Sequence, residues 1–336
     1  MEEVASAQTC GAPLHSSEPP HHSLRLRLQQ HQSVAAAHSL KPRSGHTALI
    51  VRLEPTHEVV RNEVQNTRGA SEESMARSAA LVTGGAKRIG AAICLHLAEK
   101  GYSVAVHHNS SAKSAEDLVE RLRGMGVEAC TVRGDLRNTD EVSNIISEAS
   151  SKIGPISHLV NNASRFEFDD IESVDSDSWD SHMDVNARAP MLLTRALLKQ
   201  LPNSNAKASE SATASVVNIL DQKIAAPSPD HLSYTASRYA LLGLTDALAR
   251  GLAPRLRVNA VAPGHTLGSP DQTTEGFERA QSESPLGFGP EPNDIAEAVG
   301  YLIGARAVTG QVLFVDSGER FLARSRDVLF ETEDGV

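Results

Sequence analysis

The sequence has few cysteines, few aromatic residues and no long uninterrupted hydrophobic run. Its three cysteines, Cys10, Cys94 and Cys130, form no CxxC pair, and such a sparse, odd set excludes a disulfide framework and fits a reducing compartment. No apolar stretch approaches the roughly 20 residues that a membrane-spanning helix needs. The formal net charge of −10 at pH 7 argues against non-specific binding to nucleic acid. We therefore expect a cytoplasmic protein that binds neither membranes nor nucleic acid.

The first 74 residues lack sustained helix or strand periodicity and are rich in polar residues. The acidic start Met1–Glu3 and the absence of an apolar core after it argue against a secretory signal peptide. The Leu/Arg alternation at Leu24–Leu28 leaves organelle targeting open. The scattered histidines of this region have no acidic or cysteine partners at ligand spacing, so we assign no metal site. The prediction is a disordered extension over residues 1–74.

From Ala79 onward, short apolar strands alternate with amphipathic helices. The expected strands cover residues 79–82, 103–107, 127–132, 156–160, 215–220, 257–261 and 311–315. Because parallel strands joined by right-handed helical crossovers form one doubly wound sheet, we predict an α/β Rossmann fold with seven parallel strands and helices on both faces. The predicted domain spans residues 75–322.

Two segments of this part do not fit a strand or helix pattern. Leu267–Pro292 is long and rich in Pro, Gly and Ser, and we interpret it as a substrate lid. Residues 323–336 form a C-terminal tail, in which the apolar Val328–Phe330 could dock on a neighbouring subunit.

The clearest motif lies between the first strand and the first helix. Residues 83–90 read Thr-Gly-Gly-Ala-Lys-Arg-Ile-Gly. A strand, a glycine-containing turn and a helix N-terminus together place free backbone N–H groups and a positive dipole end against a dinucleotide pyrophosphate. The candidate cofactor-binding residues of this turn are Gly84, Lys87, Arg88, Ile89 and Gly90.

The charge at the end of the second strand predicts which dinucleotide binds. A site selective for NAD usually places a carboxylate there to hold the ribose 2′-hydroxyl. Here Asn109, Ser110 and Ser111 supply only amide and hydroxyl groups. Lys87 can add positive charge toward a 2′-phosphate. The sequence therefore predicts NADPH/NADP as cofactor.

Six further signatures follow the turn in order, and together they resemble the short-chain dehydrogenase/reductase family. They are Asp135-Leu136, Asn161-Asn162-Ala163-Ser164, Asn186, Asp221, the segment from Tyr234 to Arg238, and Pro263-Gly264. The resemblance covers about Ala79 to Gly318. Arg88 in the turn, Asp221 in place of the usual serine, and Ser164-Arg165-Phe166 make the chain similar to pteridine reductases and dihydromonapterin-reductase-like members.

The resemblance implies a mechanism and a set of residues. A hydride passes from the nicotinamide to an electrophilic carbon, and Tyr234 delivers the proton. The implied catalytic residues are Asp221, Tyr234, Arg238 and Asn186. The implied further cofactor contacts are Asp135, Leu136, Asn162, Ala163, Ser164, Tyr234, Arg238, Pro263, Gly264 and Thr266. The implied substrate contacts are Arg88, Ser164, Phe166, Asp221 and Tyr234.

Arg238 departs from the family pattern, in which a lysine one helical turn after the tyrosine lowers the pKa of the phenol and binds the nicotinamide ribose. Arginine keeps the charge but is bulkier and does not release its proton. Three functions therefore remain open. The first is an NADPH-dependent reductase of a pteridine or another small carbonyl or imine compound, the second is a general ketone or 3-oxoacyl reductase, and the third is an NADP-binding protein without catalysis. The family also implies a homo-oligomer, a tetramer or a dimer.

Overall fold

The computed structural model describes residues 78–201, 214–269 and 272–332, so the predicted disordered extension over residues 1–74 lies outside the described residues. Within them the chain forms one parallel sheet with strand order β3-β2-β1-β4-β5-β6-β7. The strands are β1 (Ala79–Val82), β2 (Ser103–His108), β3 (Ala129–Arg133), β4 (Ile156–Asn161), β5 (Ser215–Ile219), β6 (Arg257–Pro263) and β7 (Val312–Val315). The predicted seven-stranded, doubly wound α/β sheet is confirmed.

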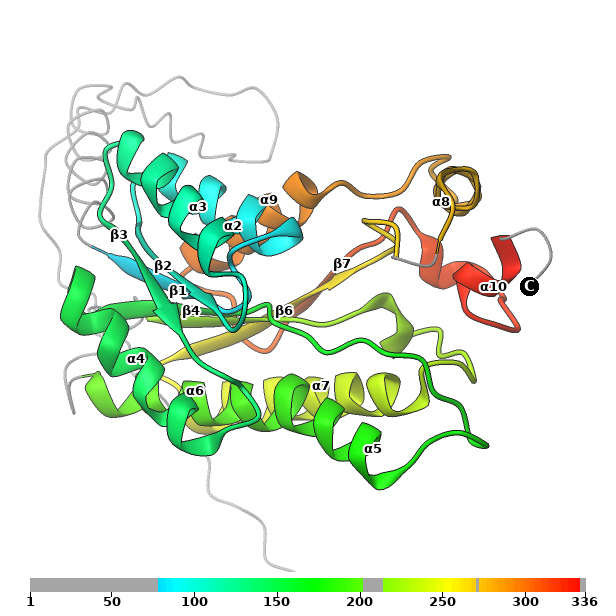
Figure 1. Cartoon of the computed structure of the whole chain (residues 1–336), viewed down its shortest axis with the longest axis horizontal. Helices are drawn as coiled ribbons and strands as arrows, with labels where there is room; N and C mark the ends of the chain where they lie inside the picture. The colour runs from blue at the N-terminus through cyan, green and yellow to red at the C-terminus, as the bar shows by residue number, and fades with distance from the viewer. Residues whose placement is uncertain (1–77, 202–213, 270–271, 333–336) are drawn as a thin grey trace, which may run out of the picture. The chain divides into compact units, whose positions relative to one another are not determined.

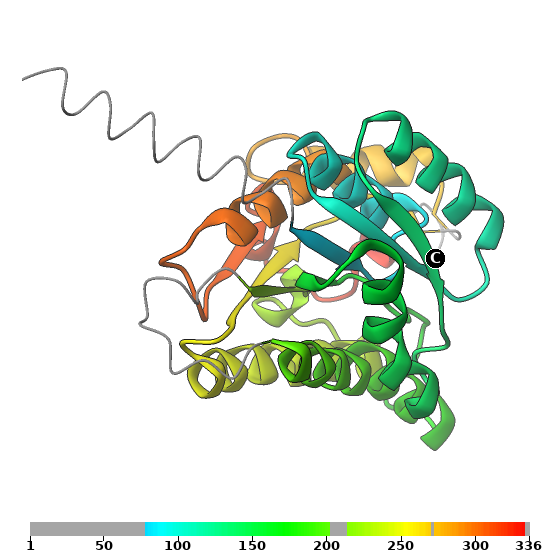
Figure 2. The ribbon, with the colours of Figure 1, turned by 90° about the vertical axis from the view of Figure 1, so that its left-hand side faces the viewer.

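Helices cover both faces of the sheet (Figures 1 and 2). On one face lie α2 (Arg88–Glu99), α3 (Ala112–Gly124) and α9 (Pro292–Gly304). On the other face lie α4 (Thr139–Ile153), α6 (Ala189–Gln200) and α7 (Leu232–Leu252). The shorter elements are α5 (Ser176–Met183), the π-helical η1 (Asp184–Arg188), the 3₁₀ turns η2 (Gln222–Ile224) and η3 (Glu319–Phe321), α8 (Thr274–Ser282) and α10 (Val328–Thr332). Among the described residues no helix is both long and apolar enough to span a bilayer.

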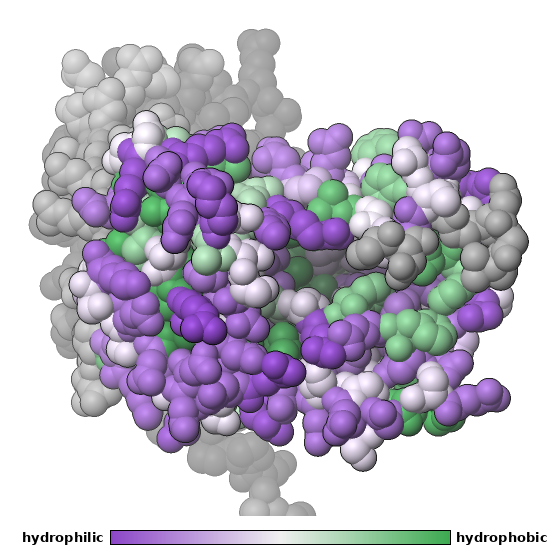
Figure 3. Space-filling model, viewed as in Figure 1, coloured by the Kyte–Doolittle hydropathy of each residue, from purple (hydrophilic) through white to green (hydrophobic). Residues whose placement is uncertain are grey.

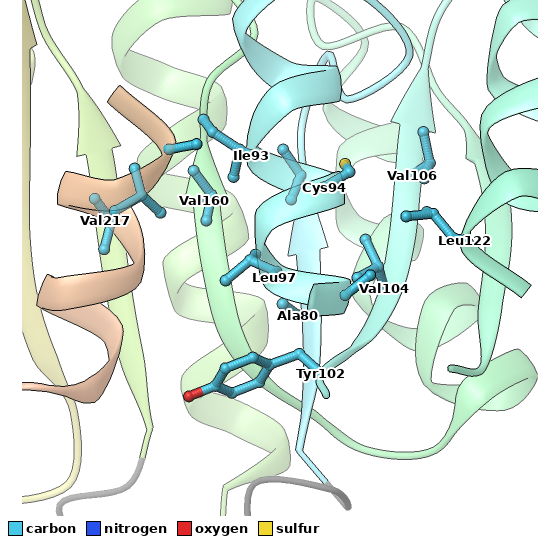
Figure 4. Close-up of a cluster of buried hydrophobic side chains, with 14 of the residues drawn as sticks. Ala80, Ile93, Cys94, Leu97, Tyr102, Val104, Val106, Leu122, Val160 and Val217 are labelled. Carbon is cyan, nitrogen blue, oxygen red and sulfur yellow. The ribbon is translucent and has the colours of Figure 1, made fainter. Parts of the chain in front are cut away.

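The central strands are apolar on both sides because helices bury both faces of the sheet. Ile93 and Leu97 of α2 pack against Val104 and Val160 of the sheet (Figure 4), and all four are fully buried. A second cluster on the opposite face joins residues of α4 and α6 to the sheet; its largest members include Ile145, Ile146, Leu159, Leu193 and Leu197.

The structure adds detail to two segments that the sequence left without a helix or strand. The expected lid Leu267–Pro292 is not loop throughout, because it contains α8, where Thr273 caps the helix by accepting a hydrogen bond from Gly276 N. The described part of the tail packs on its own chain, where Val328 is buried and Phe168 meets Phe330 edge to face. That the tail could dock on a neighbouring subunit stays a prediction.

The parallel pairing brings the ends of four strands to one edge of the sheet. Thr83 N donates to Val160 O at 3.0 Å, Leu220 N to Val261 O at 2.7 Å, and Gly264 N to Val315 O at 2.9 Å. The loops that follow β1, β4, β5 and β6 therefore start side by side. In such folds ligands bind at this carboxyl edge.

The close approach of three backbone segments depends on Gly90. A Cβ atom at Gly90 would lie 2.3 Å from Gly84 O and 2.7 Å from Asn162 Nδ2. We therefore expect Gly90→Ala to lower the free energy of unfolding by about 1–3 kcal/mol through overpacking. Urea unfolding followed by circular dichroism measures this change.

Gly243→Ala in α7 is the matched control, because nothing lies within 4 Å of a Cβ atom there. This exposed helical site should gain about 0.5–1 kcal/mol, since alanine restricts the unfolded chain more than glycine does. Equal effects of the two substitutions would contradict the steric account of the turn.

Candidate active site

A cleft of about 550 Å³ lies at the carboxyl edge of the sheet. In the space-filling view the surface is hollowed right of centre, with hydrophobic groups visible inside the hollow (Figure 3). Many of the predicted site residues line the cleft. They are Gly84, Lys87, Arg88, Ile89 and Gly90 from the turn, Asn162, Ala163, Ser164 and Phe166 after β4, Asp221 after β5, Tyr234 and Arg238 of α7, and Pro263, Gly264 and Thr266 at the end of β6.

The glycine turn is fixed from both sides by the neighbouring strands. Thr83 Oγ1 accepts hydrogen bonds from the backbone N–H groups of Asn162 at 2.9 Å and Ala163 at 3.0 Å. On the other side, Gly84 N donates to Nδ1 of His107 at 3.2 Å. The turn thus holds its shape through backbone and buried side-chain contacts.

The start of α2 suits an anionic ligand. Its N-cap residue Lys87 makes no side-chain capping bond, and the first turn holds no acidic residue. Arg88 has a φ of 54° and donates through Nη2 to Gly268 O at 3.3 Å, which joins the turn to the loop after β6. Uncapped N–H groups, the helix dipole and two cationic side chains together match a dinucleotide pyrophosphate.

Two acid–base groups meet inside the cleft. Tyr234, in the first turn of α7, donates its phenolic hydrogen to Oδ2 of Asp221 at 2.7 Å. The other oxygen, Oδ1, accepts the backbone N–H of Lys223 at 2.9 Å. This second bond orients the Asp221 carboxyl group toward the phenol.

Arg238 lies one helical turn after Tyr234 and is 3% exposed. Its Nη1 donates to Ile219 O at 3.0 Å, and its Nη2 donates to Oγ of Ser164. Its Cζ lies 4.8 Å from the centroid of the Tyr234 ring. The guanidinium therefore connects α7 to the ends of β4 and β5. Its planar geometry lets Nη1 and Nη2 donate to two different acceptors at the same time.

The charge of Arg238 lowers the pKa of Tyr234, as expected, but burial acts in the opposite direction and is the larger effect. Burial raises the pKa of Tyr234 above its ordinary value of 10.0, and the charge of Arg238 opposes this effect without overcoming it. The charge and hydrogen bond of Asp221 raise the pKa further. The phenol is consequently held in its protonated form at neutral pH.

Phe166 forms one aromatic wall beside the phenol. Its ring stacks on His231 with centroids 4.2 Å apart and meets the Tyr234 ring edge to face at 4.7 Å. Phe166 remains 43% exposed, so part of the ring is open to a ligand. A flat heteroaromatic ring could stack on this exposed part.

Asn186 does not contact Tyr234 or Arg238 through any hydrogen bond in the described structure. Its amide accepts from Arg165 N at 2.8 Å and donates to Arg165 O and to Oγ of Ser237, both at 2.9 Å. It sits in the π-helical η1 and is fully buried. These contacts hold the loop after β4 in place, and the catalytic role of Asn186 stays a prediction.

Five of the predicted cofactor residues do not line the cleft. Asn109, Ser110 and Ser111 follow β2, and Ser111 is the N-cap of α3. Asp135 forms an ion pair with Arg137 at 2.9 Å. The Leu136 side chain belongs to the core. Their cofactor contacts remain predictions.

Sequence reasoning missed a polar set at the far end of the cleft. It comprises Gln222, Lys223, His265, Glu319 and Asp327, and the nearby lining also includes Leu267, Ser269 and Val328. Their places in the sequence could have indicated that Lys223 and His265 belong to the site, since Lys223 closely follows Asp221 and His265 follows Gly264. Glu319 and Asp327 carry no such signal, because only the fold of the C-terminal segment brings them to the cleft.

Glu319 is a buried carboxyl group within this set. Its Oε2 accepts the backbone N–H of His265 at 2.6 Å, and Oε1 accepts from Nε2 of Gln222 at 3.5 Å. Burial raises its pKa to about 6, and the charge of Asp221 adds to this rise. The far end of the cleft thus holds several carboxyl groups close together.

The fold and the order of these residues define the class of protein. The chain belongs to the short chain dehydrogenase family, whose model matches residues 78–276, and it is an oxidoreductase of that family.

Several known proteins are similar to this chain over most of their own length. The 3-oxoacyl-[acyl-carrier-protein] reductase FabG of Staphylococcus aureus is 32% identical over 244 residues, which are 71% of this chain and 96% of FabG. The crystal structure of FolM alternative dihydrofolate reductase 1 from Brucella canis, complexed with NADP, is 41% identical with a TM-score of 0.70 and covers 75% of this chain and 98% of FolM. A blue fluorescent protein from a metagenomic library, in complex with NADPH, is 32% identical with a TM-score of 0.64, covering 72% of this chain and 97% of that protein.

The buried Glu319 predicts a pH dependence of stability. Its pKa is 4.5 when unfolded and about 6 when folded, so between these values the folded state binds more protons than the unfolded chain. The contribution of Glu319 to the stability of the parent protein is therefore lost as the pH rises through this window, by about 2 kcal/mol in all. Glu319→Gln lacks this ionisation.

The free energy of unfolding of Glu319→Gln minus that of the parent should consequently be about 2 kcal/mol more favourable to the variant at about pH 7.5 than at about pH 4. Urea unfolding at both pH values measures the difference. A difference between variant and parent that does not change with pH would contradict the burial of an ionising Glu319.

Proposed function

We propose that the protein is an NADPH-dependent reductase of a pteridine-like or another small carbonyl or imine compound. The observation that carries the proposal is the 2.7 Å hydrogen bond from Tyr234 to Asp221 inside the cleft. A carboxyl group beside the proton donor suits a substrate with ring nitrogens, which exchange protons, better than it suits a simple ketone. The 41% identity to a FolM alternative dihydrofolate reductase supports the same substrate class.

NADPH as cofactor is supported by the start of α2, which suits an anion, and by the similar structures, which are complexes with NADP or NADPH. Gly84, Lys87, Arg88, Ile89 and Gly90 would hold its phosphates. When bound, it supplies the hydride.

The residues of the chain supply the proton. As a carbon–nitrogen double bond of the substrate gains a hydride at carbon, the O–H bond of Tyr234 breaks and an N–H bond forms at the substrate nitrogen. The phenolate that remains is stabilised by the guanidinium of Arg238, 4.8 Å from the ring centroid. Asp221 then returns a proton to the phenol, taken in turn from solvent.

The raised pKa of Tyr234 is compatible with its role as proton donor. Reduction needs a protonated donor, and the phenol is protonated at neutral pH.

A general 3-oxoacyl reductase is the second candidate, favoured by the 32% identity to FabG. NADPH oxidation should be measured with dihydrobiopterin, dihydrofolate, a 3-oxoacyl thioester and a diketone. We expect turnover with a dihydropteridine. Turnover confined to the thioester would favour the second candidate, and tight NADPH binding without turnover would indicate a non-catalytic protein.

Tyr234→Phe provides the internal test, because it removes only the donated proton. We expect kcat to fall about 10²–10⁴-fold, with the Kd of NADPH within about twofold of the parent value. Tyr239→Phe is the matched control on the same helix, where the side chain is 42% exposed. An unchanged kcat in Tyr234→Phe would remove the phenol from the mechanism.

Arg238→Lys tests whether the site is adapted to arginine. A lysine cannot donate simultaneously to Ile219 O and to Oγ of Ser164 as the fork of Arg238 does. Loss of one charged hydrogen bond corresponds to about 1.5–3 kcal/mol. We expect kcat/KM to fall about tenfold or more, and a rise above the parent value would show that arginine impairs the site.

We further propose that the protein is a cytoplasmic homo-oligomer. Trp179 of α5 and Tyr239 of α7 each leave 42% of their surface exposed, and exposed aromatic groups of this kind are frequent in subunit interfaces. Sedimentation velocity measures the oligomeric state, and a monomer at micromolar concentration would contradict the proposal.

A further inference from the structure

A buried ion pair forms part of the far wall of the cleft. Nζ of Lys223 in η2 donates to Oδ2 of Asp327, the residue before α10, and the two side chains are 8% and 5% exposed. Both residues line the cleft and also a smaller adjoining cavity of about 190 Å³. A buried ammonium group requires a carboxylate partner, so the position of Asp327 decides where the charge of Lys223 lies.

Other contacts hold Asp327 in place. Its backbone N–H donates to Oδ2 of Asp230 at 2.7 Å, and its Oδ1 accepts from Leu329 N at 3.0 Å. The adjacent Arg326 clamps Asp230 through Nε and Nη2 at 2.7–2.9 Å. The carboxylate of Asp327 is therefore a fixed anchor for Lys223.

The backbone of Lys223 lies next to the groups proposed to react. Its backbone N–H already donates to Oδ1 of Asp221 at 2.9 Å. Besides Asp327, the charged and titratable groups that interact with its ammonium include Asp221, Asp230, Glu319, Arg324, His231 and His265. Asp221 is the one among them that accepts the hydrogen bond of Tyr234.

We propose that Asp327 is a positioning residue of the reductase site, which holds the Lys223 ammonium at the far wall of the cleft and thereby reserves the carboxyl group of Asp221 for Tyr234. The role in catalysis rests on the proposed function. The charge placement itself does not, because it follows from the contacts of the described chain.

The proposal predicts what happens when Asp327 loses its charge. In Asp327→Asn the ammonium loses its anchor and moves to the Asp221 carboxyl group. Its positive charge then offsets the charge of Asp221, which together with burial raises the pKa of Tyr234 in the parent. The pKa of Tyr234 should therefore be lower in this variant than in the parent.

The test needs neither substrate nor turnover. The chain has only 4 tyrosines, so labelling with [ζ-¹³C]tyrosine gives few resonances, and Tyr234→Phe assigns the one of interest. In Asp327→Asn its titration should begin about one pH unit or more below that of the parent, the change expected when a charge moves next to a buried group. In turnover assays, the alkaline fall of kcat should begin at a lower pH in Asp327→Asn than in the parent.

Two variants make the test specific to the charge of Lys223. In the Lys223→Met background, adding Asp327→Asn should change neither the Tyr234 titration nor kcat by more than about twofold, because no ammonium remains to move. Glu116→Gln removes an exposed carboxylate of α3 that is not among the charged groups interacting with Lys223, and this variant should titrate like the parent. Circular dichroism and the Kd of NADPH verify that each variant is folded, and the double variant keeps the test valid if Asp327→Asn alone is unstable.

Identical Tyr234 titrations in the parent and in Asp327→Asn would overturn the proposal. A shift that persists in the Lys223→Met background would overturn it as well. If the parent reduces no substrate while the Tyr234 titration shifts as expected, the proposed function fails and the positioning role of Asp327 stands. If turnover is present but the titration does not shift, the positioning role of Asp327 fails and the proposed function stands.

Discussion

The convergence of four parallel strand ends at one edge of the sheet is the constraint on which the site depends. Ends of β1, β4, β5 and β6 are joined there by backbone hydrogen bonds, so their loops cannot separate without breaking the sheet. The glycine turn, the loop that holds Ser164 and the start of the segment that holds Asp221 are consequently adjacent. Helix α7 then places Tyr234 against this edge, and the site follows from strand pairing rather than from any single motif.

Burial decides the electrostatic character of the site. In water, a cation beside a phenol would favour the phenolate, but Tyr234 lies in a dry environment where desolvation outweighs the charge of Arg238. The same effect raises the pKa of Glu319. The buried phenol of Tyr234 therefore stays protonated at neutral pH, and this state suits the proposed reductase, which must donate a proton as hydride arrives.

The C-terminal segment completes the far end of the cleft. The pairs Lys223–Asp327 and Arg326–Asp230 fasten this segment to the loop after β5. Family membership accounts for the turn, the tyrosine and the sheet. Of the charged residues that line the cleft, Glu319 and Asp327 lie outside the family match over residues 78–276.

The sequence by itself determined the doubly wound sheet and most of the cleft, because strand periodicity and the turn at Gly84–Gly90 are local patterns that dictate local backbone geometry. It also placed Asp221 and Tyr234 together, through the resemblance of their order and spacing. Only the tertiary structure decided that Asn186 holds a loop and that the pKa of Tyr234 rises. It alone brought Glu319 and Asp327 into the cleft. The reason is physical: burial and long-range charge contacts arise from packing between segments far apart in the chain, and no local pattern encodes them.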